Sequence, residues 1–304
     1  MKARSMLFTL YGDYIRHFGG TIWSGSLVTL MGELGFSSGA VRTALSRTCQ
    51  QGWLKAVRDG KNSFYSLTKL GEERMEEAAR RIFHPRSGVW DGQWTIITYG
   101  QPETKPAERG RLRGELQWLG FGRLIPGVWI SPNPLGRIAL NHLRLQGMKA
   151  SAEVFTARHI GNASSEELVR RCWDIAAINR SYEQFIRTWQ PRWKACQGEL
   201  ARGASVSNRI CFADKTWLVH EYRKFLFIDP GLPAELLPKA WAGAAAWRLF
   251  RNYYQLLADG ALGFFEQVYK APSETRWDAT QARLRALQNP FESSWEKAET
   301  ASVR

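Results

Sequence analysis

The sequence predicts an α+β multidomain protein in which three segments follow one another along the chain. Segment 1–88 combines helical spacing of apolar residues with one strand pair around a glycine turn, segment 89–162 has the order β-α-β-β-α-β, and segment 163–304 keeps helical spacing. At 304 residues the chain is too long for one ordinary domain, and its 44% hydrophobic residues are enough to form sizeable cores.

The first segment is expected to be a compact helical domain that ends in a strand pair. Gly19 and Gly20 stop its first helix, and Ser24 is a good N-cap for the second. The expected elements are a helix over 5–17, a strand over 21–23, a helix from 24, a turn over 35–37, a helix capped by Ser37 or Ser38, strands on both sides of 58–62, a helix over 69–82 and a linker over 84–88.

The third helix of this segment divides into a polar and an apolar face. At about 100° per residue, its polar residues fall within one sector of about 140°, and its apolar residues take the opposite side. A recognition helix needs this division, because one side packs on its own domain while the other enters the major groove of duplex DNA. Arginine offers a bidentate fork for guanine, and glutamine does the same for adenine. The polar face consists of Gly39, Arg42, Thr43, Ser46, Arg47 and Gln50, and the apolar face of Val41, Ala44, Leu45 and Thr48.

A tight basic turn follows this helix. Arg58-Asp59-Gly60-Lys61-Asn62 places two cations between strand-forming residues, and Trp53 is expected to close the core beneath it. This order predicts a winged helix-turn-helix domain whose wing rests on phosphate or in the minor groove. The alternative is a winged protein-interaction module, which has no need for these cations. The candidate DNA-binding residues are Ser38, Arg42, Thr43, Ser46, Arg47, Gln50, Arg58, Lys61 and Asn62.

The second segment is predicted to form a ferredoxin-like sandwich, which dimerises or links the other two segments. Some domains of this fold are metal-dependent nucleases that hold their metal with an acidic residue at the end of the first strand. Here that strand ends Thr98-Tyr99-Gly100-Gln101 without a carboxylate, and Asp91 lies before the strand, so a nuclease is only the alternative. The expected elements are strands over 93–99, 122–125, 127–131 and 152–157 and helices over 105–119 and 135–146.

The third segment is predicted to be mainly helical. One helix begins at Ser164 and continues to Pro191, a second covers 208–227, and a third spans 243–269. A peripheral helix and a frayed tail are expected over 270–304.

Catalytic and metal-binding motifs are absent from the sequence. HExxH, GxSxG, GxxxxGK[ST] and GxGxxG do not occur, so no enzyme, catalytic residue, metal or cofactor is expected. The cysteines have no CxxC pair, which favours free buried thiols in a reducing compartment. They are Cys49, Cys172, Cys196 and Cys211.

The charge balance favours a polyanionic partner such as nucleic acid, since the formal net charge is +14 and the pI is near 9.9. No apolar run approaches the ~20 residues needed to span a bilayer. Asp13 and Arg16 interrupt the apolar N-terminal stretch too early for a signal peptide. A cytoplasmic protein without a membrane partner is therefore expected.

Several stretches resemble the PaaX family of bacterial repressors, and the resemblance covers nearly all of the chain. SMLFTLYGDYIRHFGGTIWSGSLV and VRTALSRTCQQGWL resemble the family's DNA-binding domain, while RCWDIAAINRSYEQFI (171–186) and HEYRKFLFIDPGLPAELLPKAWAG (220–243) resemble its C-terminal part. The resemblance implies a homodimeric repressor of an aromatic catabolic operon, typically that for phenylacetic acid catabolism. It also implies release from double-stranded operator DNA by the effector phenylacetyl-CoA, and a middle part like the small CRISPR-associated nuclease fold.

Such an effector requires cations at one end of its pocket and aromatic residues at the other, because a coenzyme A thioester carries phosphates and here an aryl group. The third segment offers both, although core packing also explains the aromatic residues and a salt bridge to a nearby acid explains the cations. The candidate effector-binding residues are Trp173, Arg180, Tyr182, Trp217, Tyr222, Arg223 and Lys224.

Overall fold

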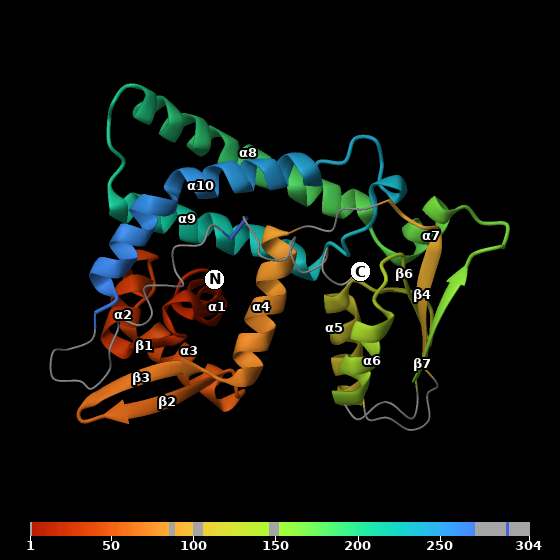
Figure 1. Cartoon of the computed structure of the whole chain (residues 1–304), viewed down its shortest axis with the longest axis horizontal. Coiled ribbons are helices and arrows are strands. Elements are labelled where there is room, and N and C mark those ends of the chain that lie inside the picture. The colour runs from red at the N-terminus through yellow and green to blue at the C-terminus, as the bar shows by residue number, and fades with distance from the viewer. Residues whose placement is uncertain (1, 85–88, 100–105, 146–151, 271–289, 292–304) are drawn as a thin grey trace, which may run out of the picture. The chain divides into compact units, whose positions relative to one another are not determined.

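The computed structural model describes residues 2–84, 89–99, 106–145, 152–270 and 290–291 (Figure 1). The chain forms two compact units. The first contains Met1–His84, Arg187–Arg223 and Trp247–Arg304, and the second contains Pro85–Ile186 and Lys224–Ala246. Each unit is α+β and contains one small antiparallel sheet together with helices.

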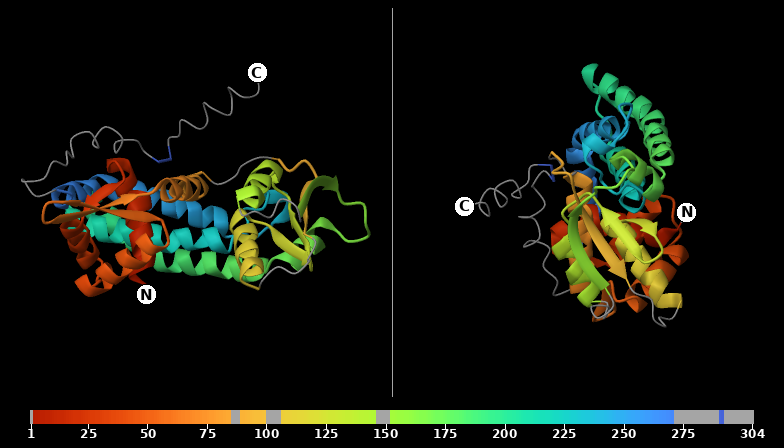
Figure 2. Two further views of the ribbon diagram at one scale, coloured as in Figure 1. Left: turned by 90° about the horizontal axis from the view of Figure 1, so that it is seen from below. Right: turned by 90° about the vertical axis from the view of Figure 1, so that its right-hand side faces the viewer.

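The N-terminal part of the first unit has the predicted order of elements. These are α1 (Ala3–Asp13), a 3₁₀ turn (Ile15–Phe18), β1 (Thr21–Trp23), α2 (Ser24–Glu33), α3 (Ser38–Gln50), β2 (Leu54–Asp59), β3 (Asn62–Leu67) and α4 (Lys69–Phe83). The three strands form an antiparallel sheet in the order β1-β3-β2, which Figure 2 shows from two further sides. Met6, Leu10, Leu27, Leu30 and Leu45 are among the fully buried residues around it.

The first helix ends earlier than the predicted 5–17. α1 stops at Asp13, and Tyr14 leaves the helical region with φ −126° and ψ −65°. At this break the ring of Tyr14 stacks on Phe265, with 4.9 Å between the centroids. The 3₁₀ turn then closes at Gly19, whose φ of +80° is in the left-handed region that glycine adopts readily.

Residues 93–158 of the second unit have the predicted strand–helix–strand–strand–helix–strand order. Its elements are β4 (Gln93–Tyr99), α5 (Pro106–Leu119), β5 (Gly122–Ile125), β6 (Val128–Ser131), α6 (Gly136–Leu145) and β7 (Ala152–Arg158). The antiparallel sheet has the order β5-β6-β4-β7. The two faces of β4 pack in two different hydrophobic cores. Ile97 packs with Leu116 of α5 and Leu143 of α6. On the other face, Trp94 packs with Leu168 and Leu236.

The C-terminal helices differ from the prediction at three places. The helix expected over 164–191 is split into α7 (Ser165–Cys172) and α8 (Ile175–Ala201). Ser164 and Glu167 form a capping box that starts α7, and the side chain of Asp174 accepts from Ala177 N at the start of α8. α8 continues through Pro191, because the buried stripe that includes Trp189 extends beyond the proline to Cys196.

The remaining elements are α9 (Asn208–Tyr222), a 3₁₀ segment (Arg223–Phe227), a short 3₁₀ turn (Ala234–Leu236) and α10 (Gly243–Val268). The helix predicted over 208–227 therefore changes to 3₁₀ geometry at Arg223. Of the peripheral helix and tail expected over 270–304, all but 270 and 290–291 lies outside the described residues.

Within the described ranges, no helix has both the length and the apolar character needed to cross a bilayer. The four cysteines are free thiols, and burial raises the pKa of Cys172 to about 11. No group of three or more possible metal ligands is present among the residues whose positions are given.

His17 makes the stability of the first unit depend on pH. Burial, helped by the neighbouring charge of Arg16, lowers the pKa of His17 to about 4. Between that value and about 6.5, the pKa of an exposed histidine, only the unfolded chain binds this proton. We therefore expect the contribution of His17 to the free energy of unfolding to be complete above about pH 6.5. It should fall by at most about 3 kcal/mol as the pH drops towards 4. Urea unfolding of the wild type and His17→Gln at pH 7 and pH 4.5 measures it; an equal acid-induced loss in both proteins would contradict it.

Candidate nucleic-acid interface

α3 exposes its polar face and buries its apolar one, as the helical spacing predicts. Val41 and Leu45 are at most 1% exposed. The packed side therefore fixes the rotation of the helix and leaves the opposite side open to a partner. The exposed residues on α3 include Ser38, Gly39, Arg42, Thr43, Ser46, Arg47 and Gln50.

Local hydrogen bonds define the start and the surface of α3. The hydroxyl of Ser37 accepts from Ala40 N at 3.3 Å, which identifies Ser37 as the N-cap. Thr43 donates its hydroxyl proton to the carbonyl of Gly39 at 3.0 Å. The Thr43 oxygen consequently faces solvent as an acceptor, while Arg42 and Arg47 supply donors from the same face.

The basic turn connects β2 and β3 with two residues. Asp59 pairs with Asn62 in the antiparallel register, so Gly60 and Lys61 form the tip, and Gly60 has a φ of +57°. Arg58 and Lys61 are exposed, and Asn62 is half-buried. Lys61 therefore lies at the tip of a short connection, while Arg58 lies in β2 just before it, so the turn is shorter than the predicted 58–62.

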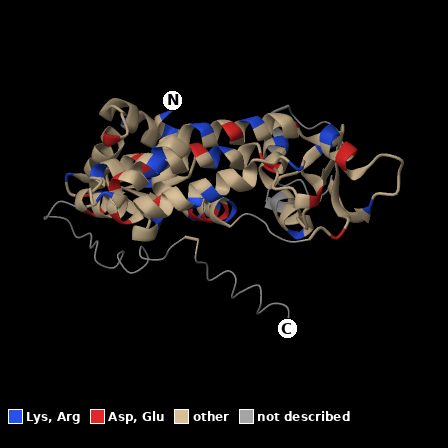
Figure 3. Ribbon diagram, turned by 90° about the horizontal axis from the view of Figure 1, so that it is seen from above, with Lys and Arg blue, Asp and Glu red and all other residues tan. Residues whose placement is uncertain are grey.

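The segment from Ser38 to Asn62 is strongly basic, with five Lys or Arg residues and one acid. Elsewhere both signs of charge are interspersed along the ribbon (Figure 3). Lys55 of this segment, and Arg4 outside it, were not identified as candidates from the sequence. Lys55 is exposed on β2, and the half-buried Arg4 of α1 donates to the side chain of Gln51, just after α3. Lys55 could have been identified from the sequence, because it lies in the strand that also exposes Arg58.

Contacts from α1 support α3 and the strand pair from behind. Trp53 packs edge-on against Phe8 with 5.3 Å between the ring centroids, which agrees with its predicted place beneath the turn. The Tyr11 hydroxyl donates to the carbonyl of Tyr65 at 3.0 Å. α1 is thus the base on which the candidate interface is built.

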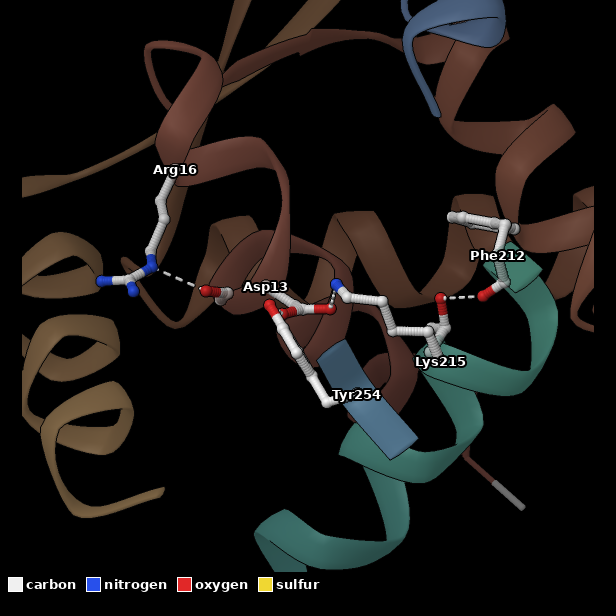
Figure 4. A network of polar contacts seen from close by, with 7 residues as sticks. Asp13, Arg16, Phe212, Lys215 and Tyr254 are labelled. Carbon is white, nitrogen blue, oxygen red and sulfur yellow. Dashed lines mark hydrogen bonds and ion pairs between the residues drawn. The ribbon is translucent and has the colours of Figure 1, made fainter. Parts of the chain in front are cut away.

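α1 is itself held to α9 and α10 by a buried ion pair that the sequence analysis missed (Figure 4). Lys215 Nζ lies 2.7 Å from Asp13 Oδ2, and the Tyr254 hydroxyl donates to Asp13 Oδ1 at 2.8 Å. Burial lowers the pKa of Lys215, although the Asp13 carboxylate opposes the shift. The ammonium also lies 4.1 Å from the centroids of the Tyr14 and Tyr254 rings. Nothing local marks this pair, because its partners are 202 positions apart.

A second polar contact joins α1 to the end of α9. Arg223 donates to Ser5 Oγ, to the Ser5 carbonyl and to Thr9 Oγ1, at 2.5, 2.6 and 2.8 Å. Thr9 Oγ1 also lies 2.9 Å from His220 Nδ1, in a hydrogen bond whose donor depends on the tautomer of the histidine ring. Burial lowers the pKa of Arg223 to about 10.

The candidate effector residues are divided between the two units. Trp217, Tyr222 and Arg223 belong to the first unit. There Trp217 stacks near Phe36, Tyr222 stacks on Phe250, and Arg223 makes the contacts to α1 described above. The members in the second unit are Trp173, Arg180, Tyr182 and Lys224.

In the second unit, Tyr182 lies in an aromatic cluster. Its ring stacks on Phe225 with 3.8 Å between centroids and meets Trp241 edge-on, while its hydroxyl donates to Asp229. Arg180 is exposed on α8, which also carries Tyr182, and Lys224 is exposed on the 3₁₀ segment that carries Phe225. Two cations therefore occur on the elements that carry the aromatic cluster.

A separate small hollow of about 60 Å³ lies in the sheet domain of the second unit. This volume is far below the about 300–1,000 Å³ of pockets that enclose ligands of drug size. It is therefore too small to hold a whole coenzyme A thioester. Its lining residues are Tyr99, Leu112, Arg113, Arg123, Pro126, Gly127 and Trp129.

The acid considered for a nuclease site has a local structural role. Asp91 lies before β4 and is exposed, and its carboxylate accepts from the backbone and side-chain amides of Gln93. β4 itself contains no carboxylate from Gln93 to Tyr99. The part of the chain that is described thus offers no acidic set for a metal on this strand.

Family models match three consecutive parts of the chain. Residues 2–71 match "PaaX-like protein", 87–169 match "PaaX protein central Cas2-like domain" and 173–267 match "PaaX-like protein C-terminal domain". The transcriptional repressor PaaX of Escherichia coli strain K12 is 34% identical over 271 residues, which cover 88% of this chain and 84% of the relative. Among solved structures, the uncharacterized protein Rv0674 from Mycobacterium tuberculosis has 24% identity and a TM-score of 0.49, with 78% of this chain and 89% of that chain covered.

Proposed function

This chain belongs to the PaaX-like protein family, and from that premise we propose that it is a transcriptional repressor that binds duplex DNA through α3 and the β2–β3 turn. The family relationship makes it a non-enzymatic regulator of transcription. The observation that carries the DNA-binding proposal is the division of α3, whose arginines are exposed while its apolar residues are buried.

We propose a three-part organisation for this repressor. Residues 1–88 form a winged helix-turn-helix domain, 89–162 a ferredoxin-like dimerisation and linker domain, and 163–304 a mainly helical C-terminal part for effector binding and dimerisation. The two compact units divide this last part between them. The β5-β6-β4-β7 order and the three family matches support this division. The protein acts in the cytoplasm, where its DNA partner is.

The proposed mode of binding places α3 in the major groove and the wing on the backbone. Arg42, Arg47 and Gln50 contact base edges, while Arg58 and Lys61 contact phosphates. A homodimer presents two such helices about 34 Å apart, so the operator is an inverted repeat with half-sites one helical turn apart. The regulated genes are those of phenylacetate catabolism, in keeping with the family.

The proposed effector is phenylacetyl-CoA or a related aryl-acyl-CoA, with no cofactor. To move a repressor from mostly bound to mostly free, the effector must distinguish the two states by several kcal/mol, about 5.5 for a change from 1:99 to 99:1. The aromatic cluster around Tyr182, with Arg180 and Lys224 on the same elements, supports a site for the thioester in the second unit.

Fluorescence anisotropy on duplex DNA from upstream of the neighbouring operon tests this function. We expect tight binding that resists random competitor DNA and that is lost when phenylacetyl-CoA, but not phenylacetate, is added. If DNA binding is retained in the presence of the thioester, the proposed effector is wrong but the proposed repressor function still holds. Absence of specific binding would overturn the proposal.

A further inference from the structure

We propose that Arg209 and Trp217 of α9 position α3 for sequence-specific DNA binding, although neither residue belongs to the face that meets DNA. This inference rests on the proposed function of α3. In this proposal α9 contributes to DNA binding indirectly, through its contacts near the connection between α2 and α3.

The ring of Trp217 fixes the residue that precedes the N-cap of α3. Phe36 and Trp217 stack with 6.4 Å between centroids and 23° between planes. Phe36 N also donates to the carbonyl of Met31 at 3.0 Å, and the next residue, Ser37, caps α3. The ring contact therefore acts where the chain enters α3, six residues before Arg42.

Arg209 holds the other end of the same connection. Its guanidinium forms an ion pair with Glu33, the last residue of α2. The two contacts from α9 consequently fall at Glu33, which ends α2, and at Phe36, which lies within the four-residue connection 34–37. An ion pair at one end and a ring contact at the other restrain both the position and the direction of α3.

α9 can restrain this connection because it is itself fixed to α1. Lys215 pairs with the buried Asp13, and Arg223 bonds to Ser5 and Thr9. Trp217 lies on the same helix between these contacts and meets the ring of His220 edge-on at 5.5 Å. One helix thus contacts both α1 and the α2–α3 connection, the two supports of α3.

A positioning role has a signature different from that of a phosphate contact. Contacts to base edges require the recognition helix to be placed accurately, whereas phosphate contacts carry no sequence information. Loss of the restraint should weaken binding to the specific site while binding to random DNA and its salt dependence stay unchanged. A purely structural defect would instead lower the unfolding midpoint and weaken both kinds of binding.

The test compares Arg209→Ala and Trp217→Leu with Arg192→Ala in the full-length protein. Arg192 pairs with Asp214 at 3.4 Å, and its side chain is 53% exposed against 70% for Arg209. Both arginine substitutions remove one positive charge and one ion pair, and Arg192→Ala also removes a cation–π contact with Trp189 at 5.0 Å. Only Arg209 contacts the end of α2, where the α2–α3 connection begins. Trp217→Phe retains an aromatic ring against Phe36 and serves as the conservative variant.

Anisotropy would be measured on duplex DNA from upstream of the neighbouring operon and on random duplex DNA of equal length, with thermal unfolding alongside. We expect Arg209→Ala and Trp217→Leu to lower the ratio of specific to random affinity about tenfold, the effect of one weakened base contact. Arg192→Ala and Trp217→Phe should leave the ratio within about twofold.

An unchanged ratio in Arg209→Ala, or an equal fall in Arg192→Ala, would overturn the positioning role. Arg209→Ala decides the matter even if Trp217→Leu fails to fold, because the Arg209 side chain is largely exposed. Arg42→Ala separates this inference from the proposed function. If Arg42→Ala lowers the ratio and the α9 variants do not, only the positioning role fails; if Arg42→Ala also has no effect, the assignment of α3 fails.

Discussion

Replacing Asp13 with alanine is expected to lower the free energy of unfolding by about 3–5 kcal/mol, because it leaves a buried ammonium without its partner. Asp13 and Lys215 are 6% and 4% exposed, and their charged groups are 2.7 Å apart. The substitution also removes the acceptor of the Tyr254 hydroxyl. Urea unfolding followed by tryptophan fluorescence measures the change.

Two further variants separate the buried pair from a general effect of charge. Lys69 and Glu73 form an exposed pair at 4.0 Å, with side chains 88% and 64% exposed, so Lys69→Ala should leave the unfolding midpoint almost unchanged. Asp13→Leu combined with Lys215→Met should recover most of the loss, since an apolar pair carries no desolvation penalty. If Asp13→Ala is no more destabilising than Lys69→Ala, the ion pair does not hold α1 against α9.

The polar contacts of α1 follow a helical spacing. Ser5, Thr9 and Asp13 are four residues apart and so lie on one face of α1. Thr9 and Asp13 contact α9, and Ser5 contacts Arg223, the residue that follows α9. Such contacts require one register between the two helices, whereas an apolar surface tolerates several. We infer that this face of α1 specifies how the N-terminal elements and α9 combine in the first unit.

The sequence predicted those parts of the fold that depend on neighbouring residues. The faces of α3, a tight turn within 58–62 and the start of α7 at Ser164 follow from helical period, turn chemistry and capping. The structure confines that turn to Gly60 and Lys61. The break between α7 and α8 also had a local signal, because Asp174 caps the second helix. The apolar spacing continues on both sides of Asp174, and for this reason the sequence predicts a single helix.

The roles of the C-terminal residues were harder to predict, because they depend on distant partners. Arg223 was a candidate for phosphate binding, yet its guanidinium contacts Ser5, 218 positions away. Trp217 was a candidate for the effector, yet it lies against Phe36. Cations and aromatic rings suit both a ligand pocket and a helix interface, so residue type alone does not distinguish the two.

Arg42→Ala and Arg47→Ala are each expected to weaken binding to the specific DNA site by about 1–3 kcal/mol and to relax base preference at the position each contacts. Both side chains are exposed on α3, whose opposite face is packed, so their removal leaves the core of the domain intact. Anisotropy on the upstream duplex and on duplexes with single base-pair changes measures affinity and preference together.

Lys61→Ala provides the contrast, because it removes a cation from the wing and not from the major-groove face. It should weaken binding to all sequences similarly and reduce the slope of log K against log salt by about one. The arginine variants should lose discrimination as well as affinity, since a bidentate base contact carries sequence information and a phosphate contact does not. If both arginine variants bind and discriminate like the wild type, α3 is not the recognition helix, and the basic turn alone would account only for binding without sequence preference.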